Sequence, residues 1–162
     1  MIRSAESTDA KAICEIYNHY VLKTHATFET AVVAEKEMQQ RIQRVQQELR
    51  LPWLVLEDEK QVVGYAYATQ WKPRGAYRRT VETTVYIHQS FQGKGYGKLL
   101  YLELIEALKA QEYHALLGGI SLPNEGSIVL HEKVGFKKVG QLQQVGFKFD
   151  RWIDVGYWEL IL

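Results

Sequence analysis

The chain has 162 residues, the length of one ordinary domain spanning residues 1–162, and its 46% hydrophobic content suits a packed core. Its 20 basic and 19 acidic residues give a net charge of +1, without the basic stripe of a nucleic-acid-binding protein or an acidic tail. The single cysteine, Cys14, excludes an internal disulfide and favours a reducing compartment. No apolar run approaches the roughly 18 residues of a membrane span, and the N-terminus lacks the apolar run of a signal peptide. We therefore expect a cytoplasmic protein with neither a membrane nor a nucleic acid as partner.

Hydrophobic periodicity divides the chain into strands and helices. Apolar residues at helical spacing, such as Ile13 and Ile16, predict a first helix that Ser7 or Thr8 caps, and they place Cys14 in or near the core. In chain order, the predicted elements are strand 2–5, helix 7–23, helix 33–50, strands 53–57 and 61–71 joined by a turn at 58–60, strand 80–88, a helix ending near 110, strand 115–121, helix 124–134, and a closing hairpin over 136–149 and 151–162.

The order of these elements, β-α-α-β-β-β-α-β-α-β-β, predicts the fold class. It indicates an α/β (α+β) domain in which about four helices flank a mixed, mostly antiparallel central sheet. The helix at about 95–110 is expected to make the one parallel crossover. The sequence contains no repeat, low-complexity tract or linker that would divide the domain.

The stretch FQGKGYGKLL, residues 91–100, places glycines at every second position where a strand gives way to a helix. It matches neither the Walker loop nor the dinucleotide fingerprint, because the residues that those motifs require at 92, 98 and 99 are different. Glycine lets backbone N–H groups approach a ligand, and a helix start offers free N–H donors and a partial positive charge. The pattern therefore favours a diphosphate site, and a tight strand-to-helix turn is the alternative.

The same stretch resembles a known motif. Gln92 to Gly97 matches Q/R-x-x-G-x-G/A, the acetyl-coenzyme A signature of the GNAT superfamily of N-acetyltransferases. A second match to that superfamily has Ser127 in place of the usual alanine and His131 in place of the usual tyrosine. It consists of Asn124, Ser127, Leu130, Gly135 and Phe136.

The histidine at 131 also narrows the resemblance. Together with THATFET, TVETTVYIH, SLPNEGS and FDRWIDVGYWEL, it is similar to the phosphinothricin acetyltransferase branch, whose members acetylate small amino-acid-like amines. The resemblance runs from Ile2 to Leu162. It implies the GNAT acyltransferase fold and acetyl-CoA as co-substrate.

Two residues are candidates for proton transfer. Glu82 is a carboxylate in an otherwise apolar alternating run, which fits either a solvated polar face or a catalytic base. His131, beside Leu130 on the helix predicted near the cofactor, fits either a structural histidine or a proton-transfer group. The resemblance implies that both are catalytic and leaves open which of them is the base and whether water relays the proton.

The resemblance also implies where acetyl-CoA binds. The strand backbone around Tyr86 is expected to pair with the pantetheine amides, residues 93–98 to hold the diphosphate, and Asn124 to bind the pantetheine arm unless it only caps its helix. The predicted cofactor-binding residues are Val85, Tyr86, Ile87, Gly93, Lys94, Gly95, Tyr96, Gly97, Lys98, Asn124 and Ser127.

The acceptor site is predicted from a basic loop and from a polar one. Arginine suits the carboxylate of an amino-acid acceptor, and residues 72–79 are rich in it, although a solvated basic loop is the alternative. The predicted substrate-binding residues are Phe28, Glu29, Arg74, Gly75, Ala76 and Tyr77. No metal site is predicted, because the five histidines are scattered without ligand spacing.

Taken together, the residues and the resemblance predict transfer of an acetyl group to a primary amine by direct attack in a ternary complex. Phosphinothricin, methionine sulfoximine and methionine sulfone are the implied acceptors. The aromatic C-terminal strands, with Trp152, Tyr157 and Trp158, fit either a core or a homodimer interface, and the branch implies a homodimer. The alternatives are a same-fold enzyme for a protein N-terminus or a polyamine, and a non-catalytic acyl-CoA-binding sensor.

Overall fold

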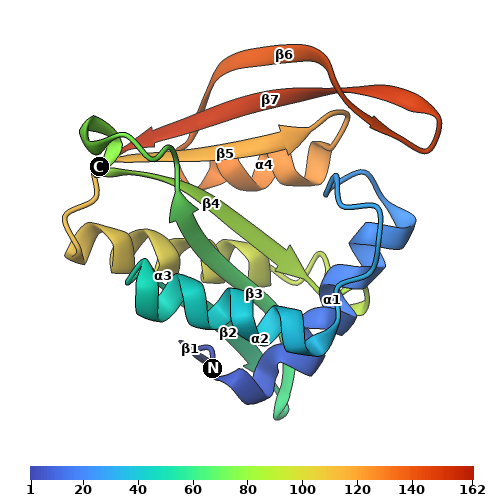
Figure 1. Cartoon of the computed structure of the whole chain (residues 1–162), viewed down its shortest axis with the longest axis vertical. Helices are drawn as coiled ribbons and strands as arrows, with labels where there is room; N and C mark the ends of the chain where they lie inside the picture. The colour runs from blue at the N-terminus through green and yellow to red at the C-terminus, as the bar shows by residue number, and fades with distance from the viewer.

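The computed structural model describes residues 1–162, and it builds one seven-stranded sheet in the order β1-β2-β3-β4-β5-β7-β6 (Figure 1). The predicted order of elements is confirmed. The strands are β1 (Ile2–Ser4), β2 (Trp53–Asp58), β3 (Gln61–Gln70), β4 (Thr80–Ile87), β5 (Ala115–Ser121), β6 (Lys137–Lys148) and β7 (Arg151–Ile161). The main helices are α1 (Ala10–Lys23), α2 (Glu35–Gln43), α3 (Tyr96–Ala110) and α4 (Glu125–Lys133).

The first two helices begin and end differently from the prediction. Neither Ser7 nor Thr8 caps α1; the Asp9 carboxylate instead accepts the Glu6 N–H at 2.8 Å, and a short 3-10 turn precedes the helix. The helix predicted over 33–50 is α2 followed by a π-helical turn over Arg44–Glu48, and Arg50 adopts a left-handed conformation ahead of Pro52.

None of the helices has the length and hydrophobicity that a bilayer crossing requires.

The sheet is mixed and mostly antiparallel, as predicted, and its one parallel pair is decisive for the site. β4 pairs with β5 in parallel over only three residues, from Thr80↔Ala115 to Glu82↔Leu117. β4 continues along β3 to Ile87, and β5 continues along β7 to Ser121. Figure 1 shows the two strands starting side by side and then separating. The sheet therefore splits in its middle.

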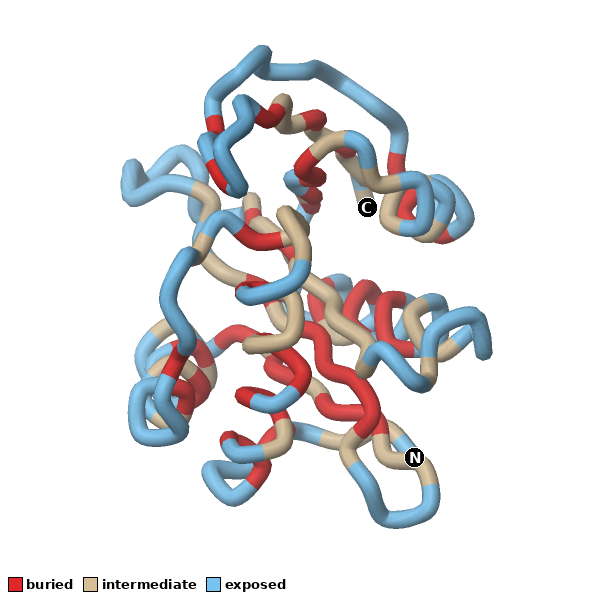
Figure 2. Tube along the Cα trace, turned by 90° about the vertical axis from the view of Figure 1, so that its right-hand side faces the viewer, coloured by how far each residue is buried: buried red, intermediate tan, exposed pale blue.

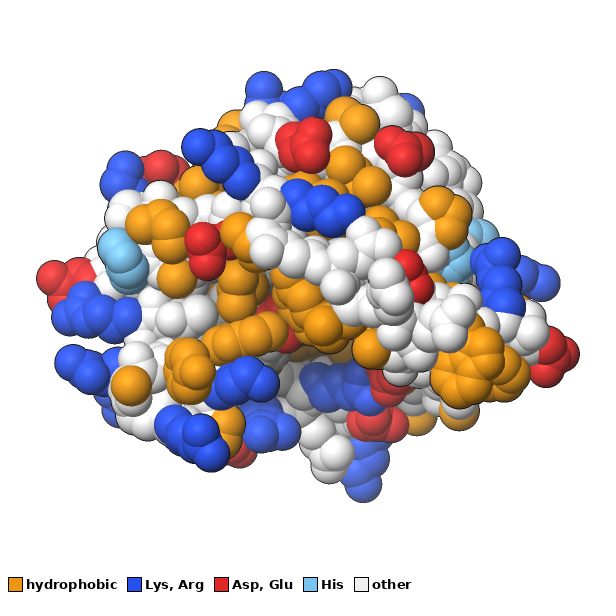
Figure 3. Space-filling model, turned by 90° about the horizontal axis from the view of Figure 1, so that it is seen from above, with side chains coloured by type: hydrophobic (Ala, Val, Ile, Leu, Met, Phe, Trp, Pro, Cys, Tyr) orange, Lys and Arg blue, Asp and Glu red, His pale blue; other side chains and the backbone are white.

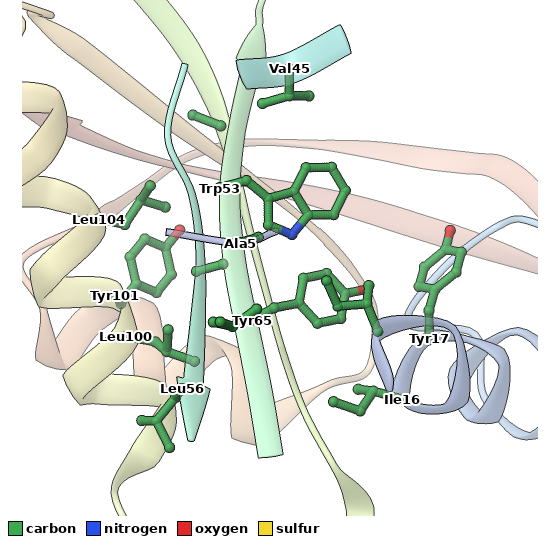
Figure 4. Close-up of a cluster of buried hydrophobic side chains, with 14 of the residues drawn as sticks. Ala5, Ile16, Tyr17, Val45, Trp53, Leu56, Tyr65, Leu100, Tyr101 and Leu104 are labelled. Carbon is green, nitrogen blue, oxygen red and sulfur yellow. The ribbon is translucent and has the colours of Figure 1, made fainter. Parts of the chain in front are cut away.

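Helices cover both faces of the sheet next to this split. Thr83 faces α3, where its hydroxyl lies 2.6 Å from the Tyr101 hydroxyl, whereas Tyr86 packs its ring against Tyr17 and Tyr20 of α1. Successive side chains of β4 alternate between these two layers, as strand geometry requires. Figure 4 shows the same division, with Leu100 and Tyr101 on one side of β2 and β3 and Tyr17 on the other.

The β6–β7 hairpin lies at the far edge of the sheet and is only partly packed. Trp158 is buried beneath α4, where its Nε1 donates to the Glu132 carboxylate at 3.2 Å, but Trp152 is 63% exposed. Figure 2 shows the outer strand of this hairpin mostly in pale blue. The aromatic residues of the C-terminal segment thus divide between the core and an exposed surface.

Tyr101 ties α3 to the sheet at the point where β4 and β5 begin to separate. It is fully buried, and its hydroxyl donates to Thr83, which itself donates to the Leu117 carbonyl at 3.2 Å. We predict that Tyr101→Phe lowers the free energy of unfolding by about 1 kcal/mol, because the ring stays and one buried hydrogen bond is lost. Denaturant unfolding measures this. Tyr113→Phe, at a residue without a side-chain hydrogen bond, is the matched control, and an equal loss in both variants would contradict the assignment.

Candidate active site

The split between β4 and β5 opens into a cleft of about 750 Å³. Its walls come from α1, β4, β5, the glycine loop and α4, and it contains both proton-transfer candidates, Glu82 and His131. Of the predicted cofactor-binding residues, only Lys94 lies outside its lining; its ammonium group sits over the Phe91 ring, 4.6 Å from the centroid. The structure therefore brings together predicted catalytic and cofactor-binding residues that are up to 49 positions apart, from Glu82 to His131.

The edge of β4 offers unpaired peptide groups to this cleft. The His88 N–H bonds the Val63 carbonyl at 2.8 Å, so peptide groups of even-numbered residues point to β3. Those of Val85 and Ile87 point the other way, where β5 has already turned aside. An extended amide-bearing ligand could pair with them as an added strand would.

One of these peptide groups, the Ile87 carbonyl, already has a partner in Tyr20, a residue that was not predicted to belong to the site. Its hydroxyl donates to the Ile87 carbonyl and accepts a hydrogen bond from the Gln92 side chain at 2.9 Å. The Ile87 N–H and both peptide groups of Val85 remain for a ligand. Gln92, the first residue of the Q-x-x-G-x-G motif, is thereby joined to the strand edge. In sequence, Tyr20 is one more apolar position of an amphipathic helix, so only the fold reveals this contact.

The glycine loop leads into α3 and leaves its first amides open. Gly93 and Gly95 have φ angles of +76° and +83°, and a Cβ atom at either position would meet nothing within 4 Å. Gly95 is the N-cap of α3, so the N–H groups that follow it lack helical partners and carry the positive end of the helix dipole. This open cradle of donors fits the diphosphate of acetyl-CoA.

The start of α4 lies across the cleft from β4. The Asn124 side-chain oxygen accepts the Ser127 N–H at 3.1 Å, so Asn124 is a helix cap, which the sequence analysis kept as an alternative to ligand binding. Its amide NH₂ group donates to no protein atom, and Asn124 is one of the residues that line the cleft. Asn124 can cap the helix with one atom and bind a ligand with the other.

His131 is buried with a defined tautomer. Its Nδ1 lies 2.7 Å from the Ser127 carbonyl, and because a carbonyl only accepts, Nδ1 carries the proton and Nε2 presents a lone pair. Burial lowers the pKa of His131 below its ordinary value, which favours the neutral ring. The ring stands edge-on to Tyr101, 5.0 Å between centroids, and against the backbone of β5.

Glu82 reaches the cleft from the other face of the sheet. A Cβ atom on Gly119 would lie 3.3 Å from the Glu82 carboxylate, whereas one on Gly118 would press on the His131 ring. Consecutive strand residues point to opposite faces, so Glu82 and His131 flank the split from opposite sides. No protein group hydrogen-bonds the Glu82 carboxylate; burial raises its pKa, and the charge of Lys72 opposes this rise only in part.

The predicted acceptor residues lie outside the lining of the cleft. Glu29 is paired with the Arg41 guanidinium, with Nη2 to Oε1 at 2.6 Å, and residues 72–79 are all exposed. The wall on the Glu82 side is built instead by Ala26, Thr27 and Tyr67. Acceptor binding by Phe28, Glu29, Arg74, Gly75, Ala76 and Tyr77 stays a prediction.

The position of His131 depends on a missing side chain at Gly118. A Cβ atom there would lie 2.6 Å from His131 Cδ2 and closer still to Nε2. We predict that Gly118→Ala lowers the free energy of unfolding by about 1–3 kcal/mol, because the buried ring must move within a packed core. Denaturant unfolding measures the loss. Gly75→Ala, whose Cβ would meet nothing within 4 Å, is the control, and an unchanged stability of Gly118→Ala would contradict the close approach.

Comparison with known proteins agrees with this geometry. The family model described as an acetyltransferase (GNAT) domain matches residues 2–156. The phosphinothricin N-acetyltransferase of Streptomyces viridochromogenes is 40% identical over 158 residues, covering 98% of this chain and 85% of that protein. The L-methionine sulfoximine/L-methionine sulfone acetyltransferase of Salmonella typhimurium is 39% identical over 161 residues, covering 99% and 94%.

A solved structure shows the same fold. The phosphinothricin acetyltransferase of Sinorhizobium meliloti, crystallised in complex with acetyl-CoA, superposes with a TM-score of 0.96 at 34% identity, over 100% of this chain and 88% of that one. The mixed seven-stranded sheet with four helices is thus the GNAT fold. The chain belongs to the GNAT superfamily of acetyl-CoA-dependent N-acetyltransferases, on its phosphinothricin acetyltransferase-like branch.

Proposed function

We propose that this enzyme acetylates the primary amine of a small amino-acid-like acceptor by direct attack in a ternary complex. The observation that carries the proposal is the placement of Glu82 and His131 on opposite sides of the split in the sheet. Phosphinothricin, methionine sulfoximine and methionine sulfone are the proposed acceptors, on the basis of the named relatives. Buried Cys14 belongs to α1 and is absent from the cleft lining, which supports direct attack over a cysteine-bound intermediate.

Different residues of the cleft would bind different parts of acetyl-CoA. The amides of residues 93–98 would hold the diphosphate, the open peptide groups of Val85 and Ile87 would pair with the pantetheine arm, and the Asn124 amide would donate to it. Bound in this way, acetyl-CoA supplies an activated acetyl thioester. The strand edge directs that thioester towards the split, where Glu82 and His131 can act.

The two proton-transfer groups have different starting states. Glu82 has a raised pKa and no protein partner, so its carboxylate is free to take a proton from the attacking amine. His131 begins neutral, with its proton held on Nδ1 by the Ser127 carbonyl, so Nε2 is a proton acceptor before it can be a donor. We therefore assign the amine proton to Glu82, and coenzyme A leaves as its thiolate anion, because Nε2 of the neutral His131 ring holds no proton to donate.

The test compares Glu82→Gln with the unchanged enzyme in a thiol-release assay over a panel of amines. We predict that kcat/KM falls by about 10²–10⁴-fold, because a general base is lost. Since the base must be ionised, activity of the unchanged enzyme should rise with pH through the raised pKa of Glu82, and the variant should lack this limb.

Two further variants complete this test. Glu106→Gln, at an exposed carboxylate on α3, is the matched control and should leave kcat/KM unchanged. Near-normal turnover by Glu82→Gln together with a large loss in His131→Ala would reverse the assignment of the base. Absence of turnover by the unchanged protein on every amine would contradict the proposed function.

We also propose that the active form is a homodimer that covers the β6–β7 hairpin. Apolar residues that are about half exposed or more lie on this hairpin. Figure 3 looks down on the hairpin side of the molecule and shows hydrophobic side chains, in orange, spread between charged ones. The residues are Val139, Leu142, Val145, Phe147, Phe149 and Trp152.

Light scattering measures the mass in solution. We predict twice the mass of one chain for the unchanged protein and the mass of one chain for Trp152→Glu combined with Phe147→Glu, because two buried charges would oppose association. Leu22→Glu, at a residue of α1 that is 54% exposed, is the control and should remain dimeric. A monomeric unchanged protein at working concentration would contradict the proposal.

A further inference from the structure

A short loop forms the wall of the cleft that faces Glu82. Residues 24–29, here the wall loop, connect α1 towards α2, and Ala26 and Thr27 line the cleft on the same side as Tyr67. Cross-strand pairing puts Tyr67 opposite Thr84, and Glu82 lies two residues further along β4 on the same face. The wall loop and Glu82 therefore bound one compartment, separate from the side of His131.

The wall loop has no regular secondary structure and is held by side chains of other elements. The Tyr17 hydroxyl of α1 lies 2.7 Å from the Thr27 hydroxyl, and the Tyr86 hydroxyl of β4 donates to the Ala26 carbonyl at 3.4 Å. Ser121, at the end of β5, bonds the ring and the carbonyl of His25. These contacts fix the loop to the three elements around the cleft.

A fourth anchor comes from the β6–β7 hairpin, and it is unusual. Lys148 is 5% exposed, and its ammonium donates to the Thr27 carbonyl at 2.8 Å. No carboxylate lies within ion-pair distance of it, and Glu29, the nearby acid, is paired with Arg41. Burial of an ammonium group without an ion pair is costly, so the bond to Thr27 is its main compensation. Burial lowers the pKa of Lys148 accordingly.

The hairpin contacts the wall loop at a second point two residues away. The Phe28 ring rests on Gly146, where a Cβ atom would lie 2.9 Å from Phe28 Cε1 and closer to other ring atoms. Gly146 is buried by this contact although its neighbours Val145 and Phe147 are exposed. One polar and one apolar contact thus join the hairpin to consecutive residues of the wall loop.

We propose that Lys148 is a positioning residue for the amine acceptor: through the Thr27 carbonyl it holds the wall loop opposite Glu82. The inference rests on the proposed function, because it takes the compartment beside Glu82 as the place where the acceptor binds. Lys148 contacts neither the glycine loop nor the open edge of β4, so it should serve the acceptor and not acetyl-CoA.

The experiment replaces Lys148 by Met, which keeps the length of the side chain and removes its donors. We predict that KM for the acceptor the unchanged enzyme uses best, among phosphinothricin, methionine sulfoximine and methionine sulfone, rises by about tenfold. The Kd of acetyl-CoA, measured by calorimetry without acceptor, should stay unchanged. Hydrogen exchange at residues 24–29 should become faster in the variant. Lys137→Met, at an exposed residue of the same strand, is the matched control and should change none of these.

Gly146→Ala disturbs the same loop without touching a charge. Its Cβ would displace the Phe28 ring, so it should raise the acceptor KM and leave the Kd of acetyl-CoA unchanged. An unchanged acceptor KM in Lys148→Met, or an equal weakening of acceptor and acetyl-CoA binding, would overturn the assignment. If the unchanged protein binds acetyl-CoA but acetylates no amine, the proposed function fails. Unaltered hydrogen exchange at residues 24–29 in Lys148→Met would instead overturn the claim that Lys148 anchors the wall loop.

Discussion

The site depends on one constraint, which is that β4 pairs with β5 over three residues and then leaves it. A strand inside a sheet normally hydrogen-bonds to a neighbouring strand on each side. Beyond Glu82, the strand β4 is paired with β3 alone. Its free edge is therefore a row of donors and acceptors that faces the interior of the molecule. Residues of α1, α3 and α4 line the cleft around this edge, so another sheet cannot pair with it while a ligand in the cleft can.

Two neighbouring glycines on β5 let this split serve as an active site. Gly118 makes room for the His131 ring on one face, and Gly119 lies against the Glu82 carboxylate on the other. Larger residues at these positions would fill the space on both sides of the strand. The absence of side chains on β5 thus allows an acid–base group to approach from each helical layer, and it separates the two groups by the thickness of the sheet.

Local patterns in the sequence predicted much of this architecture. Strand alternation and helical spacing predicted the elements, and the glycine stretch was correctly placed where a strand gives way to a helix, because these features depend on residues close together in the chain. The left-handed conformations of Gly93 and Gly95 came only with the structure. Glu82 and His131 could be singled out by residue type and resemblance. The ends of α2 and the cap of α1 were less well predicted, since a π-helical turn and the Asp9 carboxylate replace the simpler pattern.

Contacts between distant segments could not be predicted in the same way. Tyr20 bonds a carbonyl 67 positions away, and Lys148 bonds one 121 positions away. In sequence, Tyr20 is an ordinary helical apolar position and Lys148 an ordinary lysine of a hairpin. The wall of the cleft beside Glu82 is likewise built from Ala26 and Thr27, residues whose type carries no chemical signal.

The most direct test of this account is a crystal structure of the protein with acetyl-CoA. We predict that the diphosphate lies on the amides of residues 93–98 and that the pantetheine arm pairs with Val85 and Ile87. The thioester should then sit in the split, between Glu82 and His131. Acetyl-CoA bound elsewhere, or strands β4 and β5 paired beyond Glu82 and Leu117 so that the split is closed, would contradict the account.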